Sequence, residues 1–165
     1  MRYTWKWGLI GLVATCTSFT AYNSLFDPAN PHGTTIYLAL GLFLLVATLF
    51  ISVLQVKRGL QQDFNLKIGL QEGMKTALFI ILPYSVNNYF YLSSFNPSVI
   101  EKLVNAQIEN LNAAEISESR REVQLKAIYE NMTPFKKVTQ DLLRLLSISS
   151  MTTFISVILV KKFPI

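Results

Sequence analysis

The side chains of this sequence that could bind a ligand lie close together beside one proline. Tyr84, Asn87 and Asn88 follow Pro83 within a stretch that carries no charged residue. A proline bends a helix, and two carboxamides beyond the bend could line a binding site or a path through a helical bundle. Tyrosine is also enriched where a helix reaches a membrane surface. We favour this second interpretation and keep the first as an alternative.

The other reactive groups give little support to catalysis. His32 is the single histidine and Cys16 the single cysteine, so the sequence offers no histidine-based metal or haem site and no intramolecular disulfide. It contains no glycine-rich phosphate loop. Asp141 and Arg144 are a candidate ion pair of a kind that usually has only a structural role. We therefore predict no catalytic residue, no metal, no cofactor and no enzyme activity.

Small side chains recur at spacings that place them on one face of a helix. Such faces let two helix backbones approach closely, which drives helix association where lipid replaces water. Facing inward they would pack one bundle, and facing outward they would dock another membrane subunit. The candidate packing residues are Gly8, Gly11, Thr15 and Ser18, then Gly41, Thr48 and Ser52, and finally Ser149, Thr153 and Ser156.

These residues belong to four long apolar stretches. The sequence has 165 residues, of which 51% are hydrophobic and 15% charged, whereas a soluble domain typically carries about 25% charged residues. The stretches 7–26, 34–56, 76–95 and 142–160 could each cross about 30 Å of hydrocarbon as a helix. We predict an all-α integral membrane protein, a single membrane domain over 1–165 with four transmembrane helices.

The first stretch has a second interpretation. Arg2 and Lys6 precede it, as basic residues precede the apolar part of a secretory signal peptide. The apolar stretch nevertheless continues past Cys16 through Phe19 and Tyr22. We therefore expect an uncleaved first transmembrane helix.

The basic residues indicate an orientation. The loop 26–35 has no Lys or Arg, whereas the pairs Lys57-Arg58 and Lys161-Lys162 stand directly at the ends of apolar stretches. Because basic residues accumulate on the cytoplasmic side, both termini should be cytoplasmic and the segment 96–140 should lie outside, in the periplasm. Membrane insertion also accounts for the formal net charge of +5, so we exclude nucleic-acid binding.

The segment 96–140 has the composition of a soluble structure and reads as a helical hairpin. Helix starts are predicted at Asn96-Pro97, at Ser119 with Glu122, and at Thr133-Pro134, where the last helix would run on into the fourth apolar stretch. The hairpin could pack only on itself or could dock a partner or the membrane. The sequence leaves these possibilities open.

Residues 57–75 connect the second and third apolar stretches. Leu60, Phe64 and Ile68 recur at helical spacing and could lie in the membrane interface. Glycines at 59, 69 and 73 make this segment a poor helix. We expect a connector that rests on the bilayer surface.

The order of these features resembles a known family. A basic start, a glycine-containing first stretch and a strongly apolar second one precede FNLKIGLQEGMKTAL, and FNPSVIEKLVNAQIENL follows the third. With a last stretch preceded by proline, the chain is similar over nearly its whole length to the four-span membrane proteins of Bacteroidota filed as domain of unknown function 4199. The resemblance implies a bacterial inner membrane and four helices. It implies no catalytic residue, because the family has no established activity.

The absence of reactive groups and the several packing faces favour a non-enzymatic membrane protein. We expect an accessory, scaffold or assembly subunit that docks a larger inner-membrane complex. Its partners would be the lipid bilayer and either other membrane subunits or a second copy of itself. The alternative is a small oligomeric transporter or channel, with Asn87 and Asn88 along its path.

Overall fold

The structure is a computed structural model. It describes the backbone of residues 2–25, 31–114 and 116–162, and within these it describes the side chains of 6–17, 39–114 and 116–162.

Every regular element in the described part of the chain is helical, which confirms the all-α prediction. The elements are α1 (Arg2–Leu25), α2 (Pro31–Leu60), the short 3₁₀ turn η1 (Gln61–Asp63), α3 (Leu66–Phe90), the π-helical turn η2 (Tyr91–Phe95), α4 (Ser98–Ala113), α5 (Glu118–Asn131) and α6 (Pro134–Lys162). Three of the four apolar stretches coincide with α1, α2 and α6, and the third is divided between α3 and η2.

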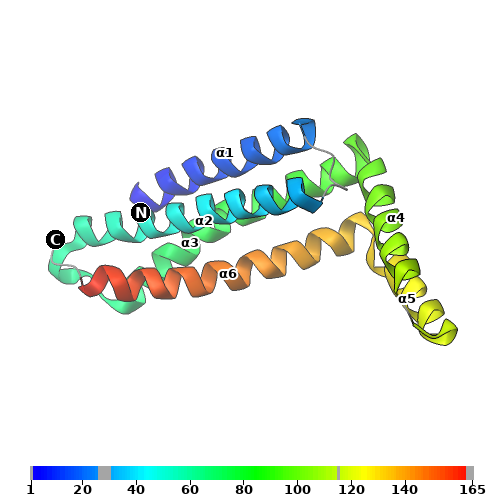
Figure 1. The fold of residues 1–165 in the computed structure, drawn as a ribbon. Helices are drawn as coiled ribbons and strands as arrows, with labels where there is room; N and C mark the ends of the chain where they lie inside the picture. Colours follow the sequence, from blue (N-terminus) through cyan, green and yellow to red (C-terminus); the bar gives the residue numbers. More distant parts are fainter. Residues whose placement is uncertain (1, 26–30, 115, 163–165) are drawn as a thin grey trace.

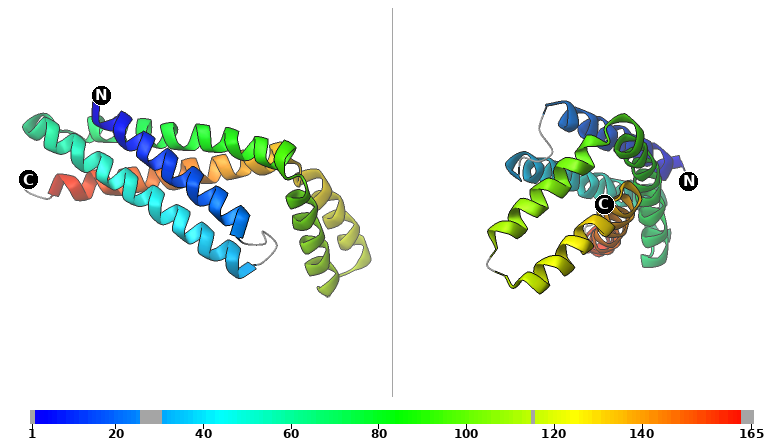
Figure 2. Two further views of the ribbon diagram at one scale, coloured as in Figure 1. Left: turned by 90° about the horizontal axis from the view of Figure 1, so that it is seen from above. Right: turned by 90° about the vertical axis from the view of Figure 1, so that its right-hand side faces the viewer.

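The four long helices α1, α2, α3 and α6 form an antiparallel bundle (Figure 1). The α1–α2 and α3–α6 pairs pack side by side, and further contacts join α1 to α3 and α2 to α6. α1 begins and α6 ends at the same end of the bundle, while α4 and α5 leave the opposite end as a hairpin (Figure 1). Viewed from above, the α1–α2 pair diverges from the α3–α6 pair toward the hairpin end (Figure 2).

The bundle interior combines two apolar clusters with buried hydroxyl groups. One cluster consists of Leu45, Leu49, Ala77, Ile80 and Ile81, and the other of Val53, Val157 and Val160. Between and beside them lie buried serine and threonine side chains from α2, α3 and α6. The buried serine and threonine residues of α2 and α6 are among the candidate packing residues named from the sequence.

The connector between α2 and α3 differs from the expectation. α2 continues to Leu60 and α3 already begins at Leu66, so most of 57–75 is helical, contrary to the expectation of a poor helix. The start of α3 is stabilised by the Asn65 side chain, whose Oδ1 accepts a hydrogen bond of 2.9 Å from the Ile68 N–H. The glycine content misled the prediction because, as described below, two of these glycines serve helix packing.

At its far end, α3 widens into the π-helical turn η2. The Tyr91 N–H donates to both the Asn87 and the Asn88 carbonyls, and the Tyr91 hydroxyl accepts a bond of 3.0 Å from Asn96 Nδ2. The Asn96 side chain is therefore bonded back to η2, and α4 begins at Ser98 without the side-chain cap expected from Asn96. A small apolar cluster of Leu92, Val99 and Val138 joins η2, α4 and α6 at this point.

The hairpin is confirmed, but its two helices differ in burial. α4 buries Val99 and Leu111, whereas no residue of α5 is buried. The sequence predicted the start of α6 correctly: Thr133 Oγ1 accepts from the Lys136 N–H at 3.3 Å, and Pro134 is the first helical residue. α6 then runs without interruption from the hairpin to the far end of the bundle.

Candidate functional site

The small residues of α1 pack against its neighbours inside the bundle. A Cβ placed on Gly8 would lie 3.0 Å from Phe79 Cβ. One placed on Gly11 would lie 2.6 Å from Ile80 Cδ1 and 2.8 Å from Thr48 Cγ2, distances too short for carbon atoms. These glycines therefore set the spacing of α1 from α2 and α3, which is the inward-facing one of the two arrangements that the sequence left open. The side chain of Ser18 lies outside the described residues.

A second close approach joins α3 to α6. A Cβ on Gly73 would collide with Thr153 Cγ2, and one on Gly69 would lie 2.9 Å from Val157. From the sequence, both glycines were expected only to weaken the helix. Their spacing, Gly-x-x-x-Gly, is the signal that could have identified them. It places two residues without a side chain on one face of the helix, where another helix can approach closely. We call this contact, made by Gly69, Gly73, Thr153 and Val157, the α3–α6 seam.

The predicted small residues of α2 and α6 are all buried except Gly41. Ser52 and Thr76 share a hydrogen bond of 2.8 Å between their hydroxyls. Because Thr76 donates its own proton to the Glu72 carbonyl at 3.0 Å, Ser52 is the donor to Thr76. The buried members are Thr48 and Ser52 on α2, and Ser149, Thr153 and Ser156 on α6.

Two buried hydroxyl groups of α6 differ from two exposed ones in their hydrogen bonding. Ser147 and Ser150, which are exposed, donate to the carbonyls of Leu143 and Leu146 one turn earlier, at 2.9 and 2.8 Å. Ser149 Oγ and Thr153 Oγ1 are fully buried and have no hydrogen-bond partner among the described residues. The close packing around Gly73 shows that the α3–α6 seam leaves no room there for a ligand.

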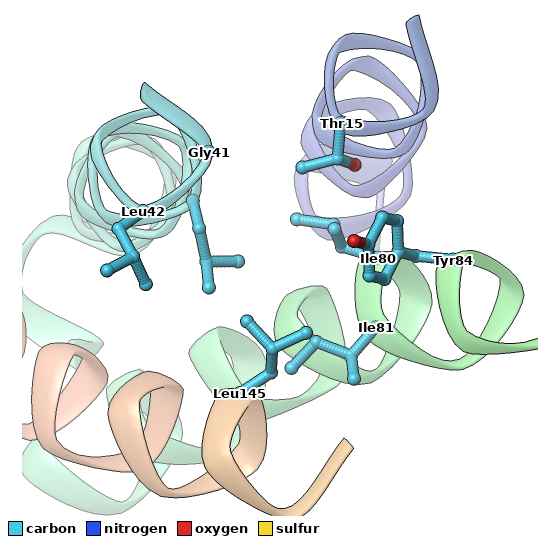
Figure 3. A pocket seen from close by; sticks show the side chains of 8 residues that line it. Thr15, Gly41, Leu42, Ile80, Ile81, Tyr84 and Leu145 are labelled. Carbon is cyan, nitrogen blue, oxygen red and sulfur yellow. The ribbon is translucent and has the colours of Figure 1, made fainter. Parts of the chain in front are cut away.

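Gly41 departs from the packing prediction, because no described atom outside the backbone of its own helix lies within 4 Å of the position that its Cβ would take. It lines a cavity of about 70 Å³ between all four bundle helices (Figure 3). The lining is predominantly apolar and includes no charged residue. It consists of Thr15, Gly41, Leu42, Leu45, Ile80, Ile81, Tyr84 and Leu145. Sequence reasoning missed its apolar residues, since no motif marks them.

The polar residues near Pro83 do not converge on one site. Tyr84 is half-buried and lines the cavity, whereas neither Asn87 nor Asn88 belongs to the lining. Asn87 is exposed and Asn88 is 5% exposed, so the two carboxamides lie in different surroundings. The Thr15 hydroxyl, at the opposite wall of the cavity, donates to the Gly11 carbonyl of its own helix at 2.6 Å.

The candidate pair of Asp141 with Arg144 is not the pair that forms. Asp141 Oδ1 accepts from Lys137 Nζ at 3.1 Å, one turn earlier on α6, and both side chains are about a quarter exposed. Arg144 is exposed. At an i,i+4 spacing Lys137 reaches the carboxylate along the helix surface, which is a common stabilising geometry.

No cluster of potential metal ligands was found among the described residues. In this part of the chain, no three His, Cys, Asp or Glu side chains lie together in a way that could hold a metal ion. The side chain of His32 lies outside the described residues.

The outer surface of the bundle is apolar. Large side chains point away from the interior on every bundle helix, with Val13, Phe43, Val86 and Ile155 each more than half exposed. A monomer in water rarely exposes apolar surface on this scale. Two stretches of described helix, Ala39–Asp63 and Pro134–Lys162, are long and apolar enough to cross a membrane. The fold is thus a helical bundle compatible with a membrane protein.

The chain belongs to the family described as "Protein of unknown function (DUF4199)", whose model matches residues 6–162. The match covers the whole bundle and the hairpin, which confirms the resemblance seen in the sequence. No curated protein and no solved structure matches the chain significantly.

Proposed function

We propose that this protein is a non-enzymatic accessory, scaffold or assembly subunit of a larger complex in the bacterial inner membrane. Four helices, α1, α2, α3 and α6, would span the bilayer. Both termini would be cytoplasmic, and the α4–α5 hairpin would project on the outer side.

The membrane location is supported by the apolar side chains that the bundle exposes and by the hydroxyl residues that it buries beside its apolar clusters. Small hydroxyl residues such as Ser52 and Thr153 are buried, whereas large apolar residues such as Phe43 and Ile155 are exposed. In water the reverse distribution is favoured, because apolar surface is driven inward. In lipid, apolar side chains lose nothing by facing outward, and small residues allow close helix packing.

The orientation is supported by the basic residues at the end of the bundle opposite the hairpin. Lys57 Nζ donates to the Val160 carbonyl at 2.6 Å and so caps the last turn of α6. Lys161 and Lys162 follow directly, and Lys67 and Lys75 lie on the first turns of α3. Such a concentration of basic residues is typical of the cytoplasmic side.

The role as a subunit is carried by one observation, the exposure of α5. This helix packs mainly against α4, and none of its residues is buried. Val123 is 70% and Tyr129 61% exposed on it. A fourteen-residue helix with so little burial gains little stability from its own chain. A partner that covers Val123 and Tyr129 would supply the missing contacts.

Purification of the tagged chain at its native level, in a mild detergent or nanodisc with mass spectrometry, tests this proposal. We expect a reproducible, near-stoichiometric set of membrane proteins that is lost when Val123 and Tyr129 are both replaced by Ser. The matched control replaces Gln124 and Glu130, which are exposed polar residues of the same helix, by Ser. Recovery of the wild-type chain alone, or only as a homo-oligomer, would refute the proposal.

The alternative role as a small transporter or channel gains no specific support from the site. Asn87 and Asn88 do not line the cavity, and the packing faces that could have joined copies of the chain lie inside the bundle.

A further inference from the structure

The cavity beside Gly41 is an exception in a tightly packed bundle. At four other glycines of the bundle helices, Gly8, Gly11, Gly69 and Gly73, an added Cβ would come within about 3 Å of a neighbouring side chain. At Gly41 the same test finds open space. Protein interiors normally contain few voids larger than a water molecule. A space of about 70 Å³ is therefore unusual, and it indicates that another molecule occupies it.

The chemistry of the lining favours an apolar occupant. Leu42, Leu45, Ile80, Ile81 and Leu145 provide most of the wall. The Thr15 hydroxyl already donates to a carbonyl of its own helix. A buried water needs two to four polar partners, and among the described lining residues only Thr15 and Tyr84 carry a side-chain hydroxyl. Predominantly apolar cavities of this kind stay dry or take up apolar molecules.

The position of the cavity along the helices points to a hydrocarbon chain. Its lining residues lie within about 9 Å, measured along each helix, of the middle of the four apolar stretches, at about 1.5 Å per residue. In a hydrocarbon layer about 30 Å thick, this depth is reached by the terminal half of lipid acyl chains. The cavity lies between the α1–α2 pair and the α3–α6 pair (Figure 3), and it is partly open to the surface of the bundle.

We propose that this cavity binds the terminal segment of an acyl chain of a bilayer phospholipid. The inference rests on the proposed membrane location but not on the role as an accessory subunit. A bound chain would replace the contacts that the bundle lacks around Gly41, and the lipid headgroup would remain at the membrane surface, outside the cavity.

Photolabelling tests the site in the intact protein. The chain is reconstituted in vesicles that contain a phospholipid with a diazirine near the end of one acyl chain, and labelled residues are mapped by mass spectrometry. We expect strong labelling of Ile80, Ile81 and Leu145. Phe43, which is 69% exposed on the outer surface, reports contact with bulk lipid, and the fully enclosed Leu49 and Val53 report the background.

A pair of variants separates the cavity from the outer surface. Gly41→Leu adds a side chain directly into the cavity, where the structure leaves space for it. Ala39→Leu adds a leucine two residues earlier on the same helix, at an exposed position. We expect Gly41→Leu to lower labelling of Ile80 and Ile81 at least fivefold and to leave Phe43 unchanged, and Ala39→Leu to behave as wild type.

The outcomes distinguish the two proposals. Absence of label at Phe43 as well as in the cavity would refute the membrane location on which the inference rests. Label at Phe43, with Ile80 and Ile81 no higher than Leu49 and Val53, would refute the acyl-chain site alone. Cavity labelling that persists in Gly41→Leu would also overturn it. The wild-type comparison stands by itself even if a variant fails to fold.

Discussion

The bundle and the hairpin both bury apolar residues, but they differ in the polar side chains that they enclose and in the apolar ones that they expose. In the bundle, Ser52, Thr76 and Ser149 are fully enclosed while Phe43 and Met151 are exposed to more than 60%. In the hairpin, the apolar residues Val99 and Leu111 are enclosed and the charged residues face outward. With the proposed membrane location, the bundle would follow the rule for lipid and the hairpin the rule for water.

This difference teaches that burial alone does not identify the core of such a protein. In the hairpin, stability comes from removing apolar surface from water. In the bundle it comes from close backbone approach, as at the α3–α6 seam, and from hydroxyl pairs such as Ser52 with Thr76. The same substitution should therefore have different consequences in the two regions.

The largest expected effect is that of a charge on the outer surface. Ile155 is 52% exposed near the middle of the last apolar stretch, and Ile155→Asp places a carboxylate where we propose lipid. A charged residue at the centre of a transmembrane helix costs about 2.5–3.5 kcal/mol on insertion scales. We expect a clear fall in the fraction of chain that resists alkaline extraction from membranes.

Val123→Asp is the matched change in the hairpin, because Val123 is even more exposed. In water it should alter stability by no more than about 0.5 kcal/mol and leave membrane insertion unchanged. Equal effects of the two substitutions would show that both regions face the same solvent.

The next largest effect is expected from filling the α3–α6 seam. Gly73→Leu would force its side chain against Thr153 and Val53, so α3 and α6 must move apart. Overpacking of this kind costs about 1–3 kcal/mol, and we expect a lower melting temperature in detergent. Gly41→Leu, which enters open space, is the control and should not lower the melting temperature. A Gly73→Leu protein as stable as wild type would contradict the close packing of α3 on α6 at the α3–α6 seam.

The architecture of α1, α2, α6 and the hairpin follows from the sequence, because apolar stretches and capping signals such as Thr133-Pro134 act locally. The roles of individual residues follow less well. Helical spacing tells which residues share a face but not which helix lies opposite. For that reason Gly41 was assigned to packing although it lines a cavity, and Gly73 was taken for a helix breaker although it contacts Thr153.

A smaller effect is expected from the hydroxyl pair inside the bundle. Ser52→Ala removes the donor to Thr76 Oγ1, while Thr76 keeps its own bond to the Glu72 carbonyl. Hydrogen bonds between membrane helices contribute about 0.6 kcal/mol on average, so we expect a small loss in reversible unfolding measured in detergent. Ser147→Ala, at an exposed position bonded to its own helix, is the control and should have no effect. A larger loss for Ser147→Ala would contradict this assignment.

The smallest effect is expected at the junction of the two regions, where Lys137 pairs with Asp141 on the first turns of α6. An i,i+4 pair on a helix surface contributes about 0.3–0.5 kcal/mol, and salt screens it. We expect a double-mutant cycle with Lys137→Gln and Asp141→Asn to give a coupling energy of this size at low salt that vanishes in high salt. The same cycle with Arg144→Gln in place of Lys137→Gln should give none, because Asp141 pairs with Lys137. Salt dependence would place this turn of α6 in water, since a pair shielded by lipid would keep its coupling at any salt concentration.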